Sequence, residues 1–197
     1  MKVSDLIGHF CTKTDLPVDV NELLPLLCSN GDETDIQFVG VDLDPEVLQG
    51  KIKIWNDRQG VYGADTKRFA NIYYHRGHET DWQRFICCKE LMHLLDPDAA
   101  HTNSTDAINQ LAEKIGLPPY MQDPIADGLA TNVDRLAEFR AAAIMLPMAA
   151  RNLLQPKLHD GSITISDIAI MADIPRKYAA FVMSPTWDQV HELFLNA

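Results

Sequence analysis

The chain contains few cysteines, and none of them are paired at the spacing of a zinc ribbon. The four are Cys11, Cys28, Cys87 and Cys88, and no Cys-x-x-Cys motif occurs. Four cysteines are too few for a disulfide framework in 197 residues, and two adjacent cysteines do not bridge easily to each other. We therefore predict reduced thiols, with Cys87 and Cys88 as buried helix residues, and we exclude a zinc ribbon.

Long apolar runs are also missing, and basic residues are outnumbered. No run approaches the roughly 18 apolar residues that span a bilayer, and no apolar segment near the N-terminus precedes a small-residue cleavage site. With 28 acidic against 17 basic residues, the net charge of −11 repels phosphate backbones and anionic membranes. The composition therefore favours a cytoplasmic protein with no membrane partner and no direct nucleic-acid partner.

Two common catalytic signatures are absent, the glycine-rich phosphate loop and Gly-x-Ser-x-Gly. A thiol nucleophile at Cys87 or Cys88 with His93 as its base is disfavoured, because spacings of five or six residues on one helix point the groups apart. The His-Glu-Leu sequence at residues 191–193 lacks a second histidine four residues on, so it indicates only a terminal helix.

The sequence does contain enough apolar residues, 46%, for one domain with a sizeable core. Residues 36–41 and 51–55 alternate in the manner of strands, and residues 71–74 are rich in β-formers. Turn residues at 56–60 are predicted to separate the second strand from the third. Together these segments predict a small sheet of three or more strands.

Most of the remaining sequence has helical periodicity. A helix over residues 81–95, with Thr80 as its N-cap, is predicted to lead out of the sheet. Further helices are predicted at residues 20–28 with a break at Pro25, at 104–115, at 131–147 and, as a short continuation, at 149–154.

Residues 165–183 have the sequence pattern of two short helices joined by a turn, similar to a helix-turn-helix unit. DNA binding by such a unit requires basic groups on the second helix. Arg176 and Lys177 are the basic residues of this segment, and the whole chain is acidic. The segment is therefore more typical of a packing or substrate-shaping role.

Within the helix predicted over 81–95, residues 89–93 read Lys-Glu-Leu-Met-His. The intact zinc-protease motif His-Glu-x-x-His places two imidazoles on one helical face, where they hold one zinc ion, and its glutamate acts as general base. Here Glu90 and His93 remain, and Lys89 stands in place of the first histidine. On these five letters alone, an ordinary amphipathic helix is favoured.

Two longer segments favour shared ancestry with a known family. Residues 84–95 resemble the motif helix of the ImmA/IrrE family of zinc metallopeptidases, in which Arg-Phe leads into Ala-His-Glu-Leu-Gly-His and a leucine-rich end. Residues 134–147 resemble that family's second signature, an acid followed by an alanine-rich helix that closes on Leu-Leu-Met-Pro. The resemblance extends over residues 36–182, and its specific letters lie in these two segments.

The resemblance implies an α+β fold of the zincin kind, in which a small sheet packs on the motif helix and the C-terminal half is helical. It implies a single domain over residues 1–197. The expected parts are the sheet with the motif helix at 36–98, a helical part at 99–156 and a small C-terminal helical unit at 157–197.

The resemblance also implies a site. Glu90 matches the catalytic base, and His93 and Asp134 match the second histidine and the acidic ligand of the zinc ion. Glu138, one helical turn after Asp134 and on nearly the same face, is the fallback ligand.

Departures from the family pattern weaken this metal site. A protonated ammonium at Lys89 does not coordinate zinc unless its pKa falls far below the usual value of about 10.4. His75 or His78, before the motif helix, are candidate replacement ligands, although two solvated loop histidines are the favoured interpretation. Alternatively, Lys89 forms an ion pair with Asp134 or Glu138 in the space of the metal.

Two functions follow as hypotheses. The first, implied by the resemblance, is a zinc-dependent, site-specific peptidase that cleaves a protein regulator, with zinc as cofactor and the regulator or a peptide as substrate. The second is a catalytically inactive, protein-binding regulatory module of the same fold, in a phage or mobile-element setting. Lys89 favours the second at least as strongly as the first.

Overall fold

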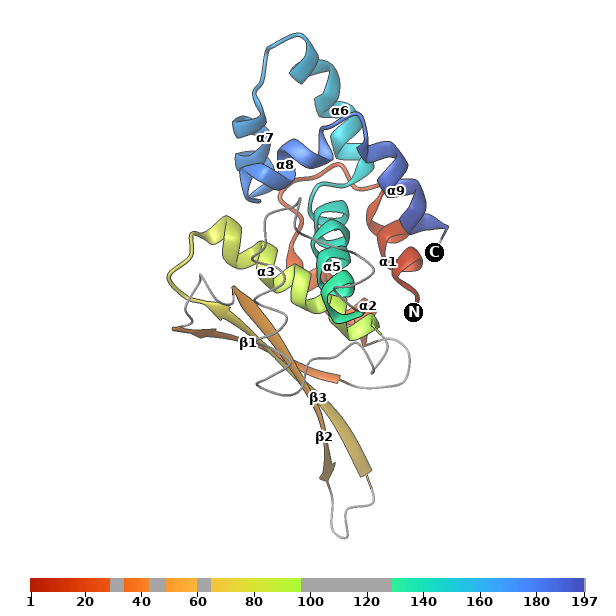
Figure 1. Ribbon diagram of the computed structural model, residues 1–197, viewed down its shortest axis with the longest axis vertical. Coiled ribbons are helices and arrows are strands. Elements are labelled where there is room, and N and C mark those ends of the chain that lie inside the picture. Colours follow the sequence, from red (N-terminus) through yellow and green to blue (C-terminus); the bar gives the residue numbers. More distant parts are fainter. Residues whose placement is uncertain (29–33, 43–48, 60–64, 97–128, 197) are drawn as a thin grey trace.

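The computed structural model describes residues 1–28, 34–42, 49–59, 65–96 and 129–196. They form a three-stranded sheet and a group of helices that gather on one side of it (Figure 1). The predicted α+β class is therefore confirmed. No helix within the described ranges is both long and apolar enough to cross a membrane.

The sheet has the strand order β1-β3-β2, with β1 at Thr34–Val41, β2 at Gly50–Gln59 and β3 at Asp65–His75. β1 runs parallel to β3, and β2 runs antiparallel to it. All three predicted strands are present, and each is longer than predicted. In Figure 1 the paired ends of β2 and β3 project beyond the helices.

The turn predicted at residues 56–60 was misplaced, because residues 56–59 continue β2. Asn56 pairs with Arg68, and Asp57 pairs with Lys67. Both Asn56 and Asp57 are exposed, and both lie in the second half of β2. Polar side chains are tolerated there because cross-strand pairing, and not burial of one face, holds that part of the strand.

The two faces of the sheet differ, because successive side chains of a strand point to opposite faces. The face toward the helices carries the apolar residues of the core, with Ala70 and Ile72 fully buried and Ile52 packed against the core cluster. No residue of the opposite face belongs to the core of the described chain. Among the described residues, the helices therefore pack against one face of the sheet.

The motif helix α3 spans Thr80–Met92 and passes into a 3-10 turn, η2, at His93–Leu95. The prediction of residues 81–95 is thus confirmed as one continuous helical segment. Its N-cap is Glu79, in an extended conformation, and not Thr80 as predicted. α3 packs against β2, β3 and the long helix α5 (Leu129–Met145).

Arg84 and Phe85 join α3 to the C-terminal helices. The Arg84 guanidinium donates hydrogen bonds to the backbone oxygens of Val18 and Asp173 and forms an ion pair with the Asp173 carboxylate at 2.7 Å. The Phe85 ring stacks on Tyr178, with 3.7 Å between ring centroids. These contacts fix the orientation of the helix that carries the candidate site.

The remaining helices come from the N-terminal segment and the C-terminal part of the chain. They are α1 at Val3–Phe10, η1 at Val20–Glu22, α2 at Leu23–Leu27, α6 at Met148–His159, α7 at Ile165–Ala172, α8 at Arg176–Val182 and α9 at Trp187–Leu195. α1 and α9 lie side by side, which brings the two chain ends together (Figure 1).

Most of these helices match the predictions. The pair α7 and α8 is confirmed, as are the helices at 20–28 and 131–147 and the terminal helix around 191–193. The break expected at Pro25 was wrong, because α2 runs through that residue. α1 was not predicted, and α6 runs through Pro156 to His159, beyond the predicted end at residue 154. The helix predicted at 104–115 lies outside the described residues.

The four cysteines are free, and Cys87 and Cys88 are buried in α3 as predicted. Burial, reinforced by the charge of Glu90, raises the pKa of the Cys87 thiol to about 12. Burial likewise raises the pKa of the Cys88 thiol. Because only a thiolate is a competent nucleophile, neither residue suits thiol catalysis.

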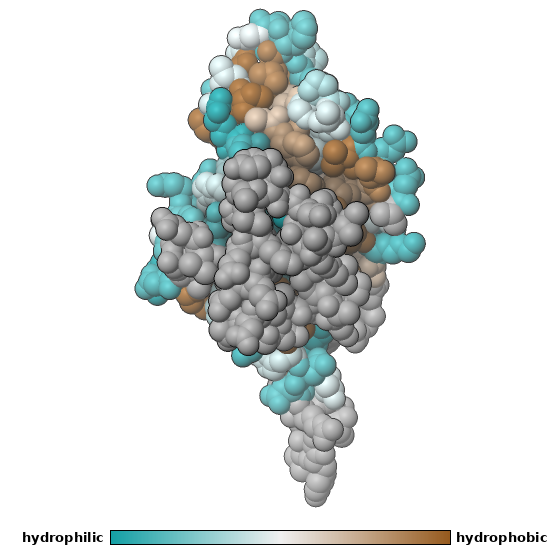
Figure 2. All heavy atoms as spheres, in the orientation of Figure 1, coloured by the Kyte–Doolittle hydropathy of each residue, from teal (hydrophilic) through white to brown (hydrophobic). Residues whose placement is uncertain are grey.

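Figure 2 shows apolar surface gathered at the end of the molecule formed by the C-terminal helices. The most exposed large apolar side chains are Ile170 on α7, Leu193 on α9 and Leu153 on α6, with 77%, 69% and 60% of their surface accessible. Large apolar side chains therefore contribute to the surface at this end of the molecule.

Candidate functional site

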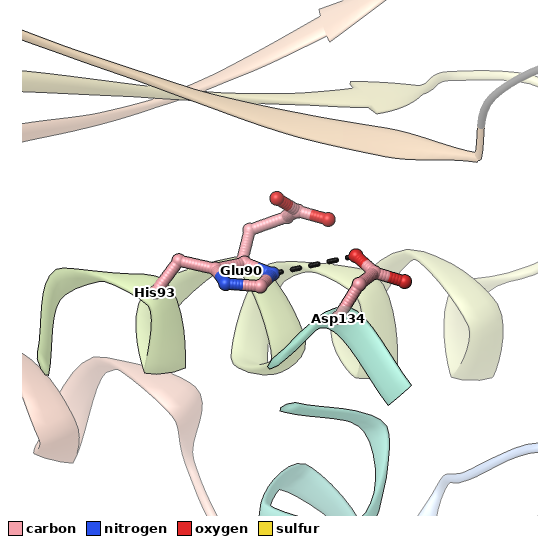
Figure 3. Close-up of side chains that lie close together, drawn as sticks. All are labelled: Glu90, His93 and Asp134. Atoms are coloured by element: carbon pink, nitrogen blue, oxygen red, sulfur yellow. Dashed lines mark ion pairs between the residues drawn. The ribbon is translucent and has the colours of Figure 1, made fainter. Parts of the chain in front are cut away.

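The candidate site lies between the sheet, α3 and α5. Glu90 comes from the last turn of α3, His93 from the start of η2 and Asp134 from the first half of α5 (Figure 3). One ligand atom from each of the three lies within 4.8 Å of the others. The structure thus brings together the three residues that the resemblance assigned to the site.

Lys89 points into the same space and contacts both acids. Its Nζ atom lies 2.6 Å from Asp134 Oδ1 and 3.3 Å from Glu90 Oε1, and only 15% of its side chain is exposed. Burial opposes the charged form of Lys89, but the charges of Asp134 and Glu90 outweigh burial and raise its pKa. The lysine is therefore a protonated internal cation, as the ion-pair alternative predicted.

His93 bridges two carboxylates. Its Nδ1–H donates to Asp96 Oδ2 at 2.7 Å, and its Nε2 lies 3.4 Å from Asp134 Oδ1. Burial alone would lower the pKa of His93, but these two carboxylates raise it to about 9. Burial also disfavours the Asp134 carboxylate, yet Lys89 and His93 together lower its pKa to about 2.

Asp96 and Arg140 complete the cluster, and neither was predicted. Arg140 donates from Nη1 to Asp96 Oδ1 at 3.0 Å, and the Asp96 side chain is only 3% exposed. The spacing of Asp96 three residues after His93 is a signal that the sequence offers, since side chains three apart meet on a helix. Arg140 carried no comparable signal, because only tertiary packing brings α5 to Asp96.

The charged side chains of this cluster pair with one another. Three side chains that carry positive charge (Lys89, His93 and Arg140) face three acidic side chains (Glu90, Asp96 and Asp134). Buried charges are tolerated when they are paired and hydrogen-bonded. Among the described residues, each acid of the cluster therefore has a basic side chain of the protein as its partner.

Gly50, the first residue of β2, covers Glu90. A Cβ atom at Gly50 would collide with Ile86 and would lie 3.3 Å from Glu90 Oε1. In Figure 3 the Glu90 side chain points from α3 toward the strands. Since the Glu90 side chain is only 4% exposed, the close approach of β2 shields it from solvent.

Glu138, the fallback ligand, has a different partner. It accepts a hydrogen bond from Tyr178, and burial together with this carboxylate raises the pKa of the Tyr178 hydroxyl. Glu138 is not part of the group formed by Glu90, His93 and Asp134. Asp134 is therefore the acid that α5 presents to His93.

The candidate replacement ligands His75 and His78 lie at the other end of α3. His75 ends β3, His78 lies in the turn before α3, and the 13 residues of α3 span about 20 Å. The two rings pack edge to face at 5.0 Å and are half-buried, so the expectation of two solvated histidines was wrong. His78 also stacks on Trp82, and the pair belongs to local packing.

The donor set was tested against zinc. Two ligand atoms on one tetrahedral zinc, each about 2.0–2.1 Å from the ion, lie roughly 3.4 Å apart. The separation of His93 Nε2 and Asp134 Oδ1, 3.4 Å, matches that value. However, the Lys89 ammonium lies against the same Asp134 oxygen at 2.6 Å. The residues as arranged do not fit a zinc ion, because a cation already occupies the place beside its acidic ligand.

Comparison of the chain with family models, with curated proteins and with solved structures finds no match. The family resemblance drawn from the two signature segments therefore stays a prediction, and the geometry of the site carries the functional argument.

Proposed function

We propose that this protein has an ImmA/IrrE-like, zincin-like scaffold that has lost its metal and its catalysis and serves as a protein-binding regulatory module. One observation carries the proposal. The Lys89 Nζ atom lies 2.6 Å from Asp134 and 3.3 Å from Glu90, between the acid that would bind zinc and the acid that would activate water.

The surroundings of Glu90 support the loss of hydrolysis. A general base in a metallopeptidase needs a water molecule that a metal ion polarises. Glu90 instead contacts the Lys89 ammonium and lies beneath Gly50 with 4% of its side chain exposed. The carboxylate is thus used in an internal ion pair.

The partner class comes from the resemblance and from the surface. The family resemblance implies a protein regulator as the molecule that the scaffold recognises. The exposed apolar side chains of Leu153, Ile170 and Leu193 are consistent with a protein partner, because apolar patches on a surface often mark interaction sites.

A second candidate function, the zinc-dependent peptidase, is favoured by one observation. His93 Nε2 and Asp134 Oδ1 keep the spacing of two ligands on one zinc ion. For this function, Lys89 must leave the site and a further ligand must replace it.

Metal analysis separates the two functions. The untagged protein, purified without chelators and then equilibrated with zinc, is examined by inductively coupled plasma mass spectrometry. We expect no bound zinc in the wild type. Lys89→His is expected to bind about one zinc per chain, because it restores two histidines at i and i+4 beside Asp134. Bound zinc should raise the unfolding free energy by about 2.7 kcal/mol at a hundredfold excess over Kd.

A matched control is Lys157→His, which places a new histidine at an exposed position of α6. It should bind no more zinc than the wild type. Stoichiometric zinc in the wild-type protein, lost on His93→Ala, would contradict the proposal and favour the peptidase. A Lys89→His protein that folds but binds no zinc would contradict descent from a zincin site.

A further inference from the structure

The outer face of the sheet, which points away from the helices, has its own pattern of side chains. We use the name outer face for the alternate residues of β2 and β3 that include Lys51, Lys53, Trp55, Lys67, Phe69, Asn71 and Tyr73. The register pairs Trp55 with Phe69, Lys53 with Asn71 and Lys51 with Tyr73. Two strands therefore contribute aromatic and basic side chains to one surface.

Four of these side chains form a ladder across the two strands. The rings of Trp55 and Phe69 stack with 5.5 Å between centroids and 14° between planes. The ammonium of Lys53 lies 5.6 Å from the Trp55 ring, and that of Lys67 lies 5.4 Å from the Phe69 ring. The order along the ladder is therefore a cation, two stacked rings and a second cation.

The ladder is not part of the core. The core residues of the sheet, such as Ile52 and Ile72, all lie on the opposite face. Trp55 and Phe69 do not belong to the core cluster and are partly exposed, and Lys53 is exposed. Burial against the described helices therefore does not explain why two large aromatic side chains stand here.

The outer face carries several of the few basic groups of this acidic protein. The protein has a net charge of −11, yet three of its nine lysines lie on this face. Lys67 pairs with Asp35 at 3.1 Å, and Asp57 lies on the same face, whereas Lys51 and Lys53 have no acid opposite them in the sheet register. The part of the outer face around Lys51 and Lys53, next to the aromatic rings, is therefore locally basic and complementary to an anionic partner.

We propose that the outer face binds single-stranded nucleic acid. Sequence-tolerant proteins of that class combine aromatic side chains, on which bases stack, with basic groups that follow the phosphates. Trp55 and Phe69 supply flat π surfaces on a sheet, and Lys51, Lys53 and Lys67 supply cations within a few residues of them. Because lysine side chains are flexible, the ammonium groups over the rings exchange their cation–π contacts for phosphates when bases stack.

Other occupants fit less well. A second copy of this chain carries the same charge of −11 and would be repelled. An acidic polypeptide would satisfy the lysines but leave the paired rings without a planar partner. The inference goes beyond the proposed function. It also departs from the expectation of no nucleic-acid partner, because that expectation rested on the net charge of the whole chain, which does not reveal a group of lysines brought together by strand pairing.

The test uses fluorescence anisotropy of the full chain with labelled homopolymers of about 12 nucleotides, a length within the usual site size. The probes are oligothymidine, oligouridine, the matched DNA duplex and a polyglutamate peptide. We expect binding to the single strands at about 50 mM salt, with a log–log salt slope of roughly −2, as three lysine contacts at about −0.7 each predict.

Variants locate the binding surface. Lys51→Glu combined with Lys53→Glu should weaken binding at least about tenfold and reduce the salt slope, because two phosphate contacts are lost. Trp55→Leu should weaken it about tenfold by removing a stacking surface. The control is Lys157→Glu on α6, an exposed lysine away from the sheet, and it should leave the affinity within about twofold. Circular dichroism melting confirms that each variant is folded.

Several results would overturn the inference. They are no binding of either single strand at low salt, equal affinity for the duplex, equal affinity for polyglutamate, or an equal loss in Lys157→Glu. Equal affinity for polyglutamate would reassign the face to an acidic protein partner. The metal analysis of Lys89 is independent of all of these results, so the two proposals fail separately.

Discussion

Lys89 places a positive charge where two buried carboxylates meet. A buried cluster of paired charges is stable only while each member keeps its partners, because an unpaired buried charge is costly. Asp134 depends most directly on Lys89, since Lys89 is its partner at 2.6 Å and His93 is 3.4 Å away. The role of Lys89 is therefore measurable as stability.

Replacing Lys89 by Met removes the cation and leaves Asp134 and Glu90 without it. We expect Lys89→Met to lower the unfolding free energy by about 3–5 kcal/mol, the usual effect of breaking a buried ion pair. Urea unfolding followed by circular dichroism measures the loss. The double variant Lys89→Met with Asp134→Leu should recover much of it, because the unpaired carboxylate is gone.

The control for this prediction is Lys157→Met, at an exposed position of α6, which should change the unfolding free energy by less than about 0.5 kcal/mol. An unfolding free energy of Lys89→Met equal to that of the wild type would show that the ion pair contributes nothing.

Gly50 is the second residue whose identity matters. Gly50→Ala should lower the unfolding free energy by about 1–3 kcal/mol, because the new Cβ overpacks the contact between β2 and α3 at Ile86. Gly8→Ala is the matched control, since Gly8 lies in α1 with no atom within 4 Å of the added Cβ. It should stabilise the protein by about 0.5–1 kcal/mol, as alanine does in a helix. Equal effects of the two substitutions would refute this account of Gly50.

At the scale of elements, the caps of the C-terminal helices differ. Thr164 caps α7 with a full capping box, in which its Oγ1 accepts from the Asp167 N–H and the Asp167 carboxylate accepts from the Thr164 N–H. Thr186 precedes α9 without a side-chain cap bond. The two threonines therefore allow a direct comparison.

Thr164→Ala should lower the unfolding free energy by about 1 kcal/mol, because it leaves an N-terminal N–H of α7 without its partner. Thr186→Ala should change it by less than about 0.5 kcal/mol. Thermal unfolding of both variants checks the prediction, and losses of equal size would mean that the capping box does not stabilise α7.

The elements also show where the sequence patterns stop being informative. The alternation of apolar and polar residues predicted the strands, and the signature segments predicted α3 and α5. Each of these elements has a buried face, and burial of one face requires apolar residues at a regular spacing. α1 was not predicted, although Leu6, Ile7 and Phe10 are fully buried in it. β2 continued through polar residues because, in its projecting part, pairing with β3 replaces burial.

At the scale of the whole molecule, His191 links stability to pH. It lies on α9 with 6% of its surface exposed, and its Nε2 has no hydrogen-bond partner among the described residues. Burial lowers its pKa; Asp188 opposes this shift and Arg151 adds to it. The unfolded chain therefore takes up a proton at His191 before the folded protein does.

We expect the unfolding free energy to fall as the pH drops below about 6.5, the ordinary histidine value, toward the lowered pKa of folded His191. In His191→Phe this part of the pH dependence should disappear, because the ring no longer titrates. Urea unfolding between about pH 7 and pH 5 measures the slope. His159→Phe, at an exposed position on α6, is the control and should leave the slope unchanged. If the unfolding free energy of His191→Phe depends on pH as steeply as that of the wild type, another titratable group causes the pH dependence.

The sequence by itself determined the α+β class, the three strands and most helices, because periodicity acts within one element. The grouping of Glu90, His93 and Asp134 was implied by the family resemblance, and the structure brings the three residues together. Tertiary structure decided the rest. Only the packing of α3 against α5 shows that Lys89 holds Asp134 and that Arg140 holds Asp96. Only the pairing of β2 with β3 gathers scattered lysines and aromatic side chains on one face. Contacts between residues far apart in the chain depend on how the elements pack, and no local pattern encodes that arrangement.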